Sequence, residues 1–260
     1  MMNRKWNPFG KAVVLLLLGA GLALSAACGA AEEKKAATAQ PAGAGAATKP
    51  ADTQSSAADA NGMVDLAAEL KLPAAAFKET PKDLKSSNLE PPRKGPRPKF
   101  LVPAGCKNVA IKKAVTSSDK EPIIGELKCI TDGSKEATEG SYVELAPGTQ
   151  WVQLDLGESY KTCAVVIWHY HGAARVYYDV VVQISDDADF IEKTTVYNND
   201  HDNSSGLGVG KEKEYIETFE GRIIDGKGAK GRYVRLYSKG NTSDDQNHYT
   251  EIEVYALPAK

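Results

Sequence analysis

The sequence predicts an all-β fold for the C-terminal part of this 260-residue chain. From Cys106 onward, short runs rich in β-branched and aromatic residues are separated by turn residues such as Gly, Asn and Asp. The runs 151–156 and 232–238 alternate apolar and polar positions, which is typical of strands with one buried face. No convincing helical stretch lies between the runs. Many short strands without helices favour an antiparallel sandwich or barrel.

The N-terminal residues have the features of a secretory signal. Basic residues precede an apolar run at 12–24, which is shorter than the roughly 20 residues that span a bilayer. Leu-Ser-Ala-Ala directly before Cys28 resembles the bacterial lipoprotein box, so we expect residues 1–27 to be cleaved and Cys28 to carry lipid. The alternative is an ordinary cleaved signal with an incidental cysteine. Gly29 resembles the sorting pattern for an outer membrane or cell surface, so the expected location is extracytoplasmic in the cell envelope.

Two further segments precede the β-rich part. Residues 28–62 are Ala, Gly, Thr, Ser and Pro with a few charges, which predicts a disordered linker because nothing large is available to bury. Residues 63–103 carry prolines at a density that excludes long helices and central strands. This Pro-rich segment is either an extended arm packed along the next domain or more linker. The β-domain is predicted at 104–260.

Net charge limits the possible binding partners, and the cysteine content limits the possible disulfides. The net charge of −2 gives no basic footprint for nucleic acid, so we expect none as a partner. Contact with a membrane is expected through the N-terminal lipid only. Apart from Cys28, the chain has Cys106, Cys129 and Cys163, and this odd number allows one disulfide with a free thiol, or none.

The strands expected within the β-domain share β-branched and aromatic enrichment. In chain order they are 108–116, 151–156, 163–171, 176–185, 215–219, 222–224, 232–238 and 251–257. The third run ends in Trp168, His169, Tyr170 and His171, with Arg175 close behind. Residues i and i+2 of a strand share a face, so the two histidines are expected to project together.

Six short motifs follow one another in an order that points to a known family. They are Asn108-Val109-Ala110, Ile130–Gly133, Trp151–Gly157, Val182–Asp187, Arg232–Tyr237 and Glu251–Tyr255. Their succession resembles the discoidin domain, also called the coagulation factor V/VIII type C domain, of the galactose-binding-like superfamily. The resemblance implies a jelly-roll β-sandwich of about eight strands. It also implies binding without catalysis, since members bind carbohydrate, phospholipid or protein.

The resemblance further implies a structural calcium ion. Calcium prefers six to eight oxygen ligands, and the matching positions are Asp132, Ser134, Thr138 and Glu251. Two departures are that Thr138 lies one residue further from Asp132 than is usual, and that a serine stands at position 134. The alternative is that Asp132 belongs to a plain turn and that Glu251 is an exposed strand residue.

A ligand site is expected where the loop after His171 meets the polar loop that follows Tyr197. Donors and acceptors for sugar hydroxyls would come from His169, His171, Arg175, Asn198, Asn199 and Asp200. Nearby tyrosines could stack on a sugar ring. One alternative is that the histidines only satisfy buried hydrogen bonds or lie on an exposed face. Another is a transition-metal site, because His169, His171, His201 and Asp200 are suitable ligands.

Catalytic motifs are not recognisable. The sequence has no GxSxG, no HExxH and no glycine-rich phosphate loop, so we predict no catalytic residues and no enzyme. The expected function is a lipid-anchored module that recognises a glycan or cell-surface polysaccharide. The alternative is a non-catalytic protein–protein interaction or adhesion domain at the cell surface.

Overall fold

The computed structural model describes residues 58–59, 61–77, 84 and 86–259. All of them belong to one compact unit, Thr53–Lys260. The predicted signal 1–27, Cys28 and most of the predicted linker lie outside the described residues. In the described part of the chain, no helix is long and apolar enough to cross a membrane.

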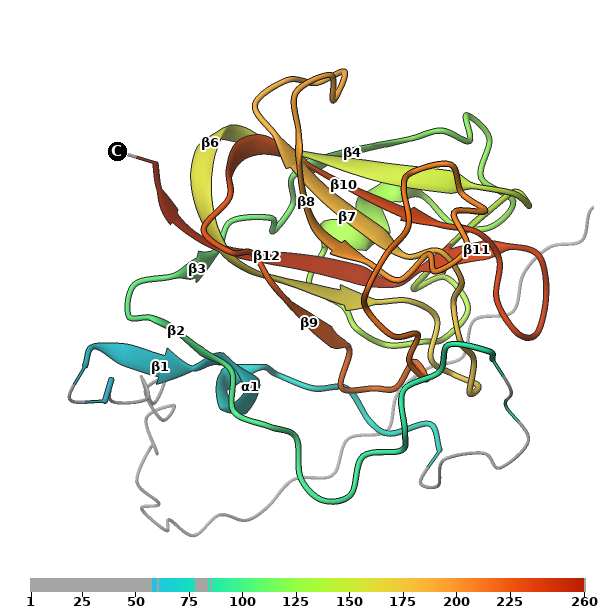
Figure 1. Ribbon diagram of the computed structural model, residues 1–260, viewed down its shortest axis with the longest axis horizontal. Helices are drawn as coiled ribbons and strands as arrows, with labels where there is room; N and C mark the ends of the chain where they lie inside the picture. The colour runs from blue at the N-terminus through green and yellow to red at the C-terminus, as the bar shows by residue number, and fades with distance from the viewer. Residues whose placement is uncertain (1–57, 60, 78–83, 85, 260) are drawn as a thin grey trace, which may run out of the picture. The chain divides into compact units, whose positions relative to one another are not determined.

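One long strand, β6 (Gln150–Trp168), belongs to both layers of a sandwich (Figure 1). Its first half pairs with β4 (Ala114–Ser117) on one side and β10 (Lys230–Ser238) on the other. This first sheet continues through β7 (Val181–Ser185) to β8 (Thr194–Asn198). All of these pairings are antiparallel, which agrees with the predicted sandwich.

The second half of β6 belongs to the other sheet. It pairs with β12 (Glu251–Pro258) and β9 (Arg222–Asp225), and β3 (Lys107–Asn108) lies beyond β12. A separate pair is formed by β5 (Val143–Leu145) and β11 (Asn247–Tyr249). The prediction of an all-β antiparallel sandwich is therefore confirmed.

Gly157 explains how β6 passes between the two sheets. Its φ of 87° lies in the left-handed region, which glycine adopts without steric cost. The pairing of β6 with β10 shifts register in the same region, between Gly231 and Tyr233. A bulge of this kind bends a strand and increases its twist. We expected separate strands at 151–156 and 163–171, and this was wrong because the bend at Gly157 does not interrupt the strand.

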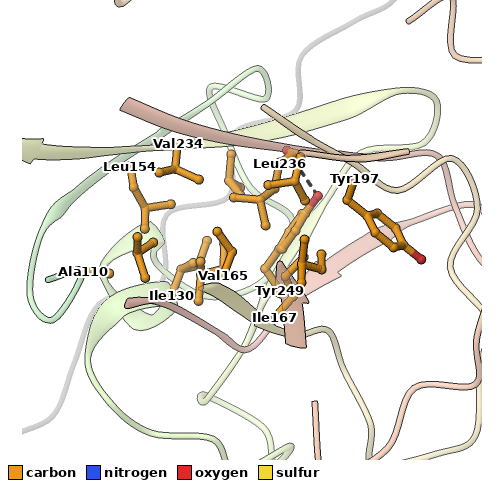
Figure 2. Close-up of a cluster of buried hydrophobic side chains, with 14 of the residues drawn as sticks. Ala110, Ile130, Leu154, Val165, Ile167, Tyr197, Val234, Leu236 and Tyr249 are labelled. Atoms are coloured by element: carbon orange, nitrogen blue, oxygen red, sulfur yellow. Dashed lines mark hydrogen bonds between the residues drawn. The ribbon is translucent and has the colours of Figure 1, made fainter. Parts of the chain in front are cut away.

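The main core fills the space between the sheets (Figure 2). Leu154, Val234 and Leu236 come from the first sheet, and Val165 and Ile167 come from the second half of β6. A short 3-10 helix, η1 (Leu127–Thr131), contributes a buried isoleucine. The predicted inward positions of the alternating runs are buried as expected.

A second core covers the outer face of the second sheet. Residues 63–103 supply β1 (Met63–Asp65), α1 (Leu66–Glu69) and β2 (Leu101–Pro103), and β1 pairs with β2. Leu66 and Val102 pack with Trp168, which lies on the face of β6 opposite to the main core. The arm therefore packs along the sandwich, and both faces of this half of β6 are buried.

Other strand predictions differ from the structure. Residues 176–180 precede β7 as an irregular segment, and 215–219 contains only an isolated bridge between Ile216 and Val176. The 108–116 run divides into β3 and β4 around a turn that includes Lys112, whose φ is 55°. The strands β5, β8 and β11 were not predicted, because their polar residues and short lengths weaken the alternating pattern.

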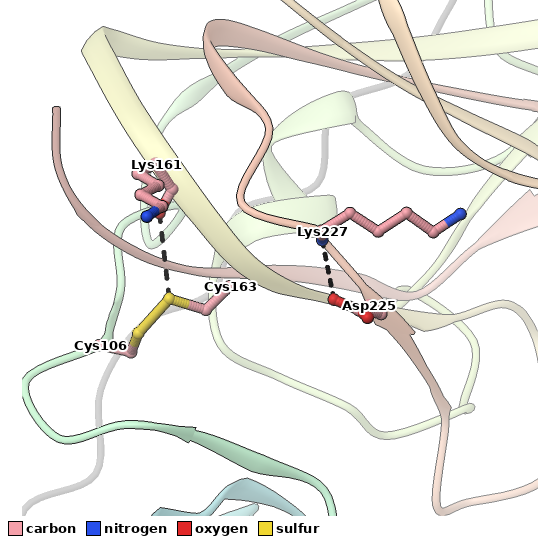
Figure 3. The surroundings of a disulfide bond; sticks show 5 residues. All are labelled: Cys106, Lys161, Cys163, Asp225 and Lys227. Atoms are coloured by element: carbon pink, nitrogen blue, oxygen red, sulfur yellow. Dashed lines mark hydrogen bonds between the residues drawn. A yellow bond between two sulfur atoms is a disulfide. The ribbon is translucent and has the colours of Figure 1, made fainter. Parts of the chain in front are cut away.

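A disulfide joins Cys106 to Cys163 across 57 residues (Figure 3). It links the segment before β3 to the second half of β6. Cys129 remains a free thiol, half-buried at the edge of the main core. The sequence allowed either one disulfide with a free thiol or no disulfide, and the structure has the first arrangement.

Candidate functional site

Both ends of β6 lie at the same end of the sandwich because of its bend. The segment between β10 and β12 joins them: the Asn247 side chain donates to the Gly148 carbonyl (3.0 Å), and the Thr250 N–H donates to the Trp168 carbonyl (2.8 Å). The loops after β6, before β6 and after β10 therefore meet at one edge. This edge carries the candidate site.

Six side chains from these loops form a continuous aromatic and charged group. We call it the rim cluster, and its members are Tyr142, Glu144, Tyr170, Arg175, Asp244 and His248. The Tyr142 and Tyr170 rings meet edge to face, with centroids 4.9 Å apart. The His248 ring lies 5.8 Å from Tyr142 and 6.0 Å from Tyr170. Both tyrosines are half-buried, so parts of their rings are open to solvent.

Arg175 is held by an ion pair and an aromatic ring. Its Nη1 donates to Asp244 Oδ2 at 2.9 Å, and its guanidinium lies 4.7 Å from the centre of the Tyr170 ring. Asp244 is fixed in turn by Asn241, whose side-chain amide donates to its other carboxylate oxygen (2.6 Å). Cation–π contact and a carboxylate together orient a guanidinium without using all of its five donors.

His248 and Glu144 form the buried side of the rim cluster. His248 Nε2 lies 3.1 Å from Glu144 Oε2. Burial, followed by the nearby charge of Arg175, lowers the pKa of His248 to about 4. Burial and then the charge of Asp244 raise the pKa of Glu144. At neutral pH the imidazole is therefore neutral, and it can donate one hydrogen bond and accept another.

The chemistry of the rim cluster suits a polyhydroxylated ligand. Partly exposed tyrosine faces offer an apolar surface for the C–H groups of a sugar ring. Arg175 supplies donors, and Asp244 and Glu144 supply acceptors, all within one surface. Few precisely placed polar groups beside aromatic rings are characteristic of small-molecule sites.

His169 is not part of this surface. Its side chain is fully buried, stacks on Tyr177 with ring centroids 4.3 Å apart, and places Nδ1 2.9 Å from Glu217 Oε2. Strand β6 ends at Trp168, so the two histidines do not project together from a strand. This corrects the expectation that His169 contacts a ligand, because it lies beneath the rim cluster and is closed to solvent.

His171 is also buried. Its Nε2–H donates to the Lys135 carbonyl at 2.9 Å, which fastens the loop after β6 to the loop that follows η1. The alternative of histidines that satisfy buried hydrogen bonds therefore describes both positions. The third residue predicted in this loop, Arg175, does reach the rim cluster, and its side chain is 14% exposed.

The polar loop after β8 uses its side chains on backbone groups, both within the loop and in the segment before β7. Asn198 Nδ2 donates to the Gly208 carbonyl (2.9 Å), and Asn199 Oδ1 accepts from the Val180 N–H (2.6 Å). Asp200 accepts from the Ser204 and Ser205 N–H groups, at 3.0 Å each. All three predicted residues are buried. This corrects the expectation that they face a sugar, because their polar atoms hold the loop.

The transition-metal alternative is not supported by the arrangement of the histidines. His169 and His171 have the separate partners described above, and His201 lies near Ser87 and Glu214. Within the described residues, no group of three candidate ligands includes a histidine.

The predicted calcium ligands are brought together only in part. The Gly133 N–H donates to Glu251 Oε2 (3.1 Å), so Asp132 and Glu251 are neighbours. Thr138 Oγ1 lies 3.2 Å from Ser141 Oγ, and the Ser134 N–H donates to Asp132 Oδ1 (2.7 Å). Among the residues that the structure describes, Gly133 is the hydrogen-bond partner of Glu251, and the Ser134 and Thr138 hydroxyls are not.

Glu251 nevertheless has the character of a cation ligand. It is fully buried, in contrast to the exposed position that the alternative required, and its Oε1 lacks a hydrogen-bond partner among the described residues. Burial raises the pKa of Glu251 to about 9. A buried carboxylate oxygen without a partner is costly, and a bound cation would satisfy it. Asp132 and Glu251 therefore fit the implied ion.

Four members of the rim cluster were not predicted: Tyr142, Glu144, Asp244 and His248. They come from two segments that lie about 100 residues apart in the sequence. The signal that could have found them is the single β-pairing of β5 with β11, which sets His248 opposite Glu144. Neither strand is long enough to be read from its pattern.

Two cavities lie outside the rim cluster in the described part of the chain. One, of about 570 Å³, lies between the arm and 215–223 and is lined by Arg93, Arg97 and Arg222 among others. The other, of about 340 Å³, is lined by Asp179, Glu214 and neighbouring polar residues.

Comparison with known families identifies part of the sandwich. Residues 129–236 match the "NedA-like, galactose-binding domain" family, of F5/F8 type C. The matched range runs from η1 to β10 and so includes β6 and most of the first sheet. No curated protein matches the chain.

Solved structures of similar shape include a chitosan-binding module from a chitosanase/glucanase of Paenibacillus sp. IK-5. It has 25% identity and a TM-score of 0.38, and the match covers 57% of this chain and 98% of that one. A CBM32 of AlyQ, in complex with 4,5-unsaturated mannuronic acid, has 22% identity and a TM-score of 0.37, with coverage of 54% and 92%. A family 89 glycoside hydrolase from Clostridium perfringens has 17% identity and a TM-score of 0.44, with coverage of 58% and only 15%. With TM-scores below 0.5, these likenesses carry no part of the assignment.

Proposed function

We propose that the chain carries an F5/F8 type C, galactose-binding-like domain, the family that residues 129–236 match, and that this domain binds carbohydrate through the rim cluster without catalysing a reaction. The observation that carries the proposal is the rim cluster itself. It places the partly exposed rings of Tyr142 and Tyr170 beside the guanidinium of Arg175 and the carboxylate of Asp244.

Each member of the rim cluster has a distinct role in the proposal. The tyrosine faces pack against the C–H groups of a sugar ring, and Arg175 donates to its hydroxyl oxygens. Asp244 accepts hydroxyl protons and keeps Arg175 in place. His248, which is neutral at physiological pH, orients the Glu144 carboxylate on the buried side of the rim cluster. The buried His169 and His171 support the loop that presents Arg175.

A structural calcium ion at Asp132 and Glu251 is part of the same proposal. The ion would occupy the position facing Glu251 Oε1 and would pin the loop after η1 to β12. That loop also accepts the hydrogen bond from His171, so the ion would stabilise the segment that leads to Arg175. A single calcium titration measures both this ion and a second cation site.

We also propose that the protein is lipid-anchored at Cys28 and extracytoplasmic, on an outer membrane or cell surface. The Cys106–Cys163 disulfide supports this location, because disulfides persist mainly in oxidising compartments. Substitution Cys28→Ser should move the chain from the membrane fraction to the soluble fraction. Retention of the variant in the membrane would contradict the anchor.

A glycan array probed with the full-length chain in mild detergent tests the binding proposal. We expect sugar-dependent binding that Arg175→Ala weakens about tenfold or more, since hydrogen bonds to charged groups contribute about 1.5–3 kcal/mol. The matched control is Arg232→Ala. Arg232 also pairs with a carboxylate, Asp155 (2.6 Å), and lies over a tyrosine ring, Tyr233 (5.1 Å), but it belongs to β10 outside the rim cluster.

Two results would overturn the proposal. One is equal loss of binding in Arg175→Ala and Arg232→Ala. The other is the absence of binding to any glycan by wild-type protein that melts cooperatively. The second result, together with capture of a defined surface protein, would favour the adhesion alternative.

A further inference from the structure

A second group of acidic side chains lies outside the rim cluster and the Asp132–Glu251 pair. We call its members the loop carboxylates: Asp179, Asp200, Asp202 and Glu214. One carboxylate oxygen from each of the three aspartates lies within 4.8 Å of the others. Asp179 precedes β7, whereas Asp200 and Asp202 follow β8. The group thus joins two loops at the ends of neighbouring strands.

The spacing of the three oxygens suits one ion. Calcium–oxygen distances are about 2.3–2.6 Å, so two ligands on opposite sides of one calcium ion are about 4.8 Å apart. Three oxygens within that distance fit inside a single coordination sphere. Asp200 and Asp202, at alternate positions, also have the spacing with which short calcium-binding loops supply their first carboxylates.

Glu214 gives an independent indication of a cation site. It is 2% exposed, and its Oε2 has no hydrogen-bond partner among the described residues. It lines the cavity of about 340 Å³ together with Asp179 and Asp202. Burial raises the pKa of Glu214 most, His201 opposes this effect, and the charges of Asp179 and Asp202 add smaller contributions that raise it. A buried carboxylate that faces other carboxylates requires a positive charge.

The positive groups beside the cavity only partly meet this need. Lys239 Nζ lies 3.9 Å from Asp179 Oδ2, donates to the Ser204 carbonyl (2.8 Å), and has a side chain that is 36% exposed. His201 Nδ1 lies 3.9 Å from Glu214 Oε1, on the oxygen opposite to the orphaned one. Lys213 also acts on Glu214, but its Nζ donates to Asn88 Oδ1 (2.7 Å). Among the described residues, Glu214 Oε2 has no hydrogen-bond partner.

We propose that the loop carboxylates bind a hard divalent cation of the calcium type, at a site separate from Asp132 and Glu251. The ion would join the loop after β8 to the residue before β7. Lys239 would act as a competing charge at its edge. The site would explain why Asp179, Asp200 and Glu214 are buried beside one another.

Calorimetric titration of CaCl₂ into the chelator-treated full-length chain, in mild detergent, tests the site. We expect Asp202→Asn to remove one bound ion that Glu251→Gln leaves in place. Asp202 is exposed, so its substitution should preserve folding. The matched control is Asp186→Asn, an exposed carboxylate in the turn at the other end of β7, which should remove no ion. Lys239→Met should tighten binding at the site about threefold or more.

Several results would overturn the second site. They are absence of calcium binding by the wild type, loss of all binding in Glu251→Gln, and an unchanged ion count in folded Asp202→Asn. If Asp202→Asn does not fold, the calcium affinity of Lys239→Met tests the site instead. In that case unchanged or weaker calcium affinity contradicts the site. Titration of Glu251→Gln distinguishes absence of the second site from absence of an ion at Asp132 and Glu251.

Discussion

Arg175 and His169 are close in the sequence but have opposite environments. Arg175 reaches the rim and pairs with Asp244, whereas His169 is enclosed by Tyr177, Tyr249 and Glu217. The sequence predicted that both residue types could serve a binding loop. It could not predict which one is exposed, because burial here is decided by segments 40–80 residues further along the chain.

The same limit applies to Asn198, Asn199 and Asp200. Side chains rich in acceptors indicate either a ligand site or a loop that bonds to its own backbone, and the residue types are the same in both cases. The structure shows the second use for Asn198 and Asp200, and Asn199 bonds to the backbone of Val180 before β7. In contrast, Glu251 was predicted as a ligand from its place in the motif and stays a prediction; it is buried, and its Oε1 has no hydrogen-bond partner among the described residues.

His248 predicts a pH dependence of stability. Burial and the charge of Arg175 lower its pKa to about 4 in the folded state, from the ordinary value of 6.5 that a free imidazole has. The folded state therefore binds fewer protons than the unfolded state between these values, and the free energy of unfolding falls as the pH drops from about 6.5 to 4. We expect the melting midpoint of wild-type protein to fall over this range more steeply than that of His248→Gln.

Other groups around His248 set the control for this measurement. Arg175, Asp244 and Glu144 face the imidazole, and all three are present in both proteins. Their effect is common to wild type and His248→Gln, so the difference between the two melting curves isolates the imidazole. Parallel curves from pH 6.5 to 4 would contradict a lowered pKa at His248.

At the scale of elements, β6 shows what a sequence pattern reveals. The run at 163–168 is apolar at every position, while 151–156 alternates. The structure gives the reason: the first half has one buried face, and the second half packs against the main core on one face and the arm on the other. The continuity of β6 through Gly157 was not predictable, because a glycine marks a bulge and a turn equally well.

The arm predicts a measurable contribution to stability. Leu66 is 1% exposed and packs in the second core with Trp168. Substitution Leu66→Ala should lower the free energy of unfolding by about 2–4 kcal/mol, through lost burial and the cavity that remains. Chemical denaturation of the full-length chain in mild detergent measures this difference.

Leu72 provides the matched control for Leu66. It lies in the same arm, but its side chain is 39% exposed. Leu72→Ala should change the free energy of unfolding by less than about 0.5 kcal/mol. Equal effects of the two substitutions would contradict a packed arm and would favour the linker alternative.

For the whole molecule, the order of short motifs was sufficient to predict a β-sandwich. Four of the six motifs lie in the strands β6, β7, β10 and β12, whereas Ile130–Gly133 lies at the end of the 3-10 helix η1. The binding edge was harder to predict. It is assembled from loops at the ends of these strands, and their meeting depends on β5 and β11, which are three residues each.

The disulfide gives a prediction at this scale. Closing 57 residues between Cys106 and Cys163 restricts the unfolded chain, so the double substitution Cys106→Ser/Cys163→Ser should lower the free energy of unfolding by about 2–4 kcal/mol. Cys129→Ser removes a free thiol and should leave the denaturation midpoint nearly unchanged without reductant. A midpoint that reductant does not lower in the wild type would contradict the disulfide.

The central claim is that carbohydrate binds at the rim cluster, and a crystal structure with the best glycan from the array tests it most directly. The account predicts a sugar ring against Tyr142 or Tyr170, with a hydroxyl within hydrogen-bonding distance of Arg175. A sugar bound instead in the 570 Å³ cavity beside the arm, with the rim cluster free, would contradict the claim.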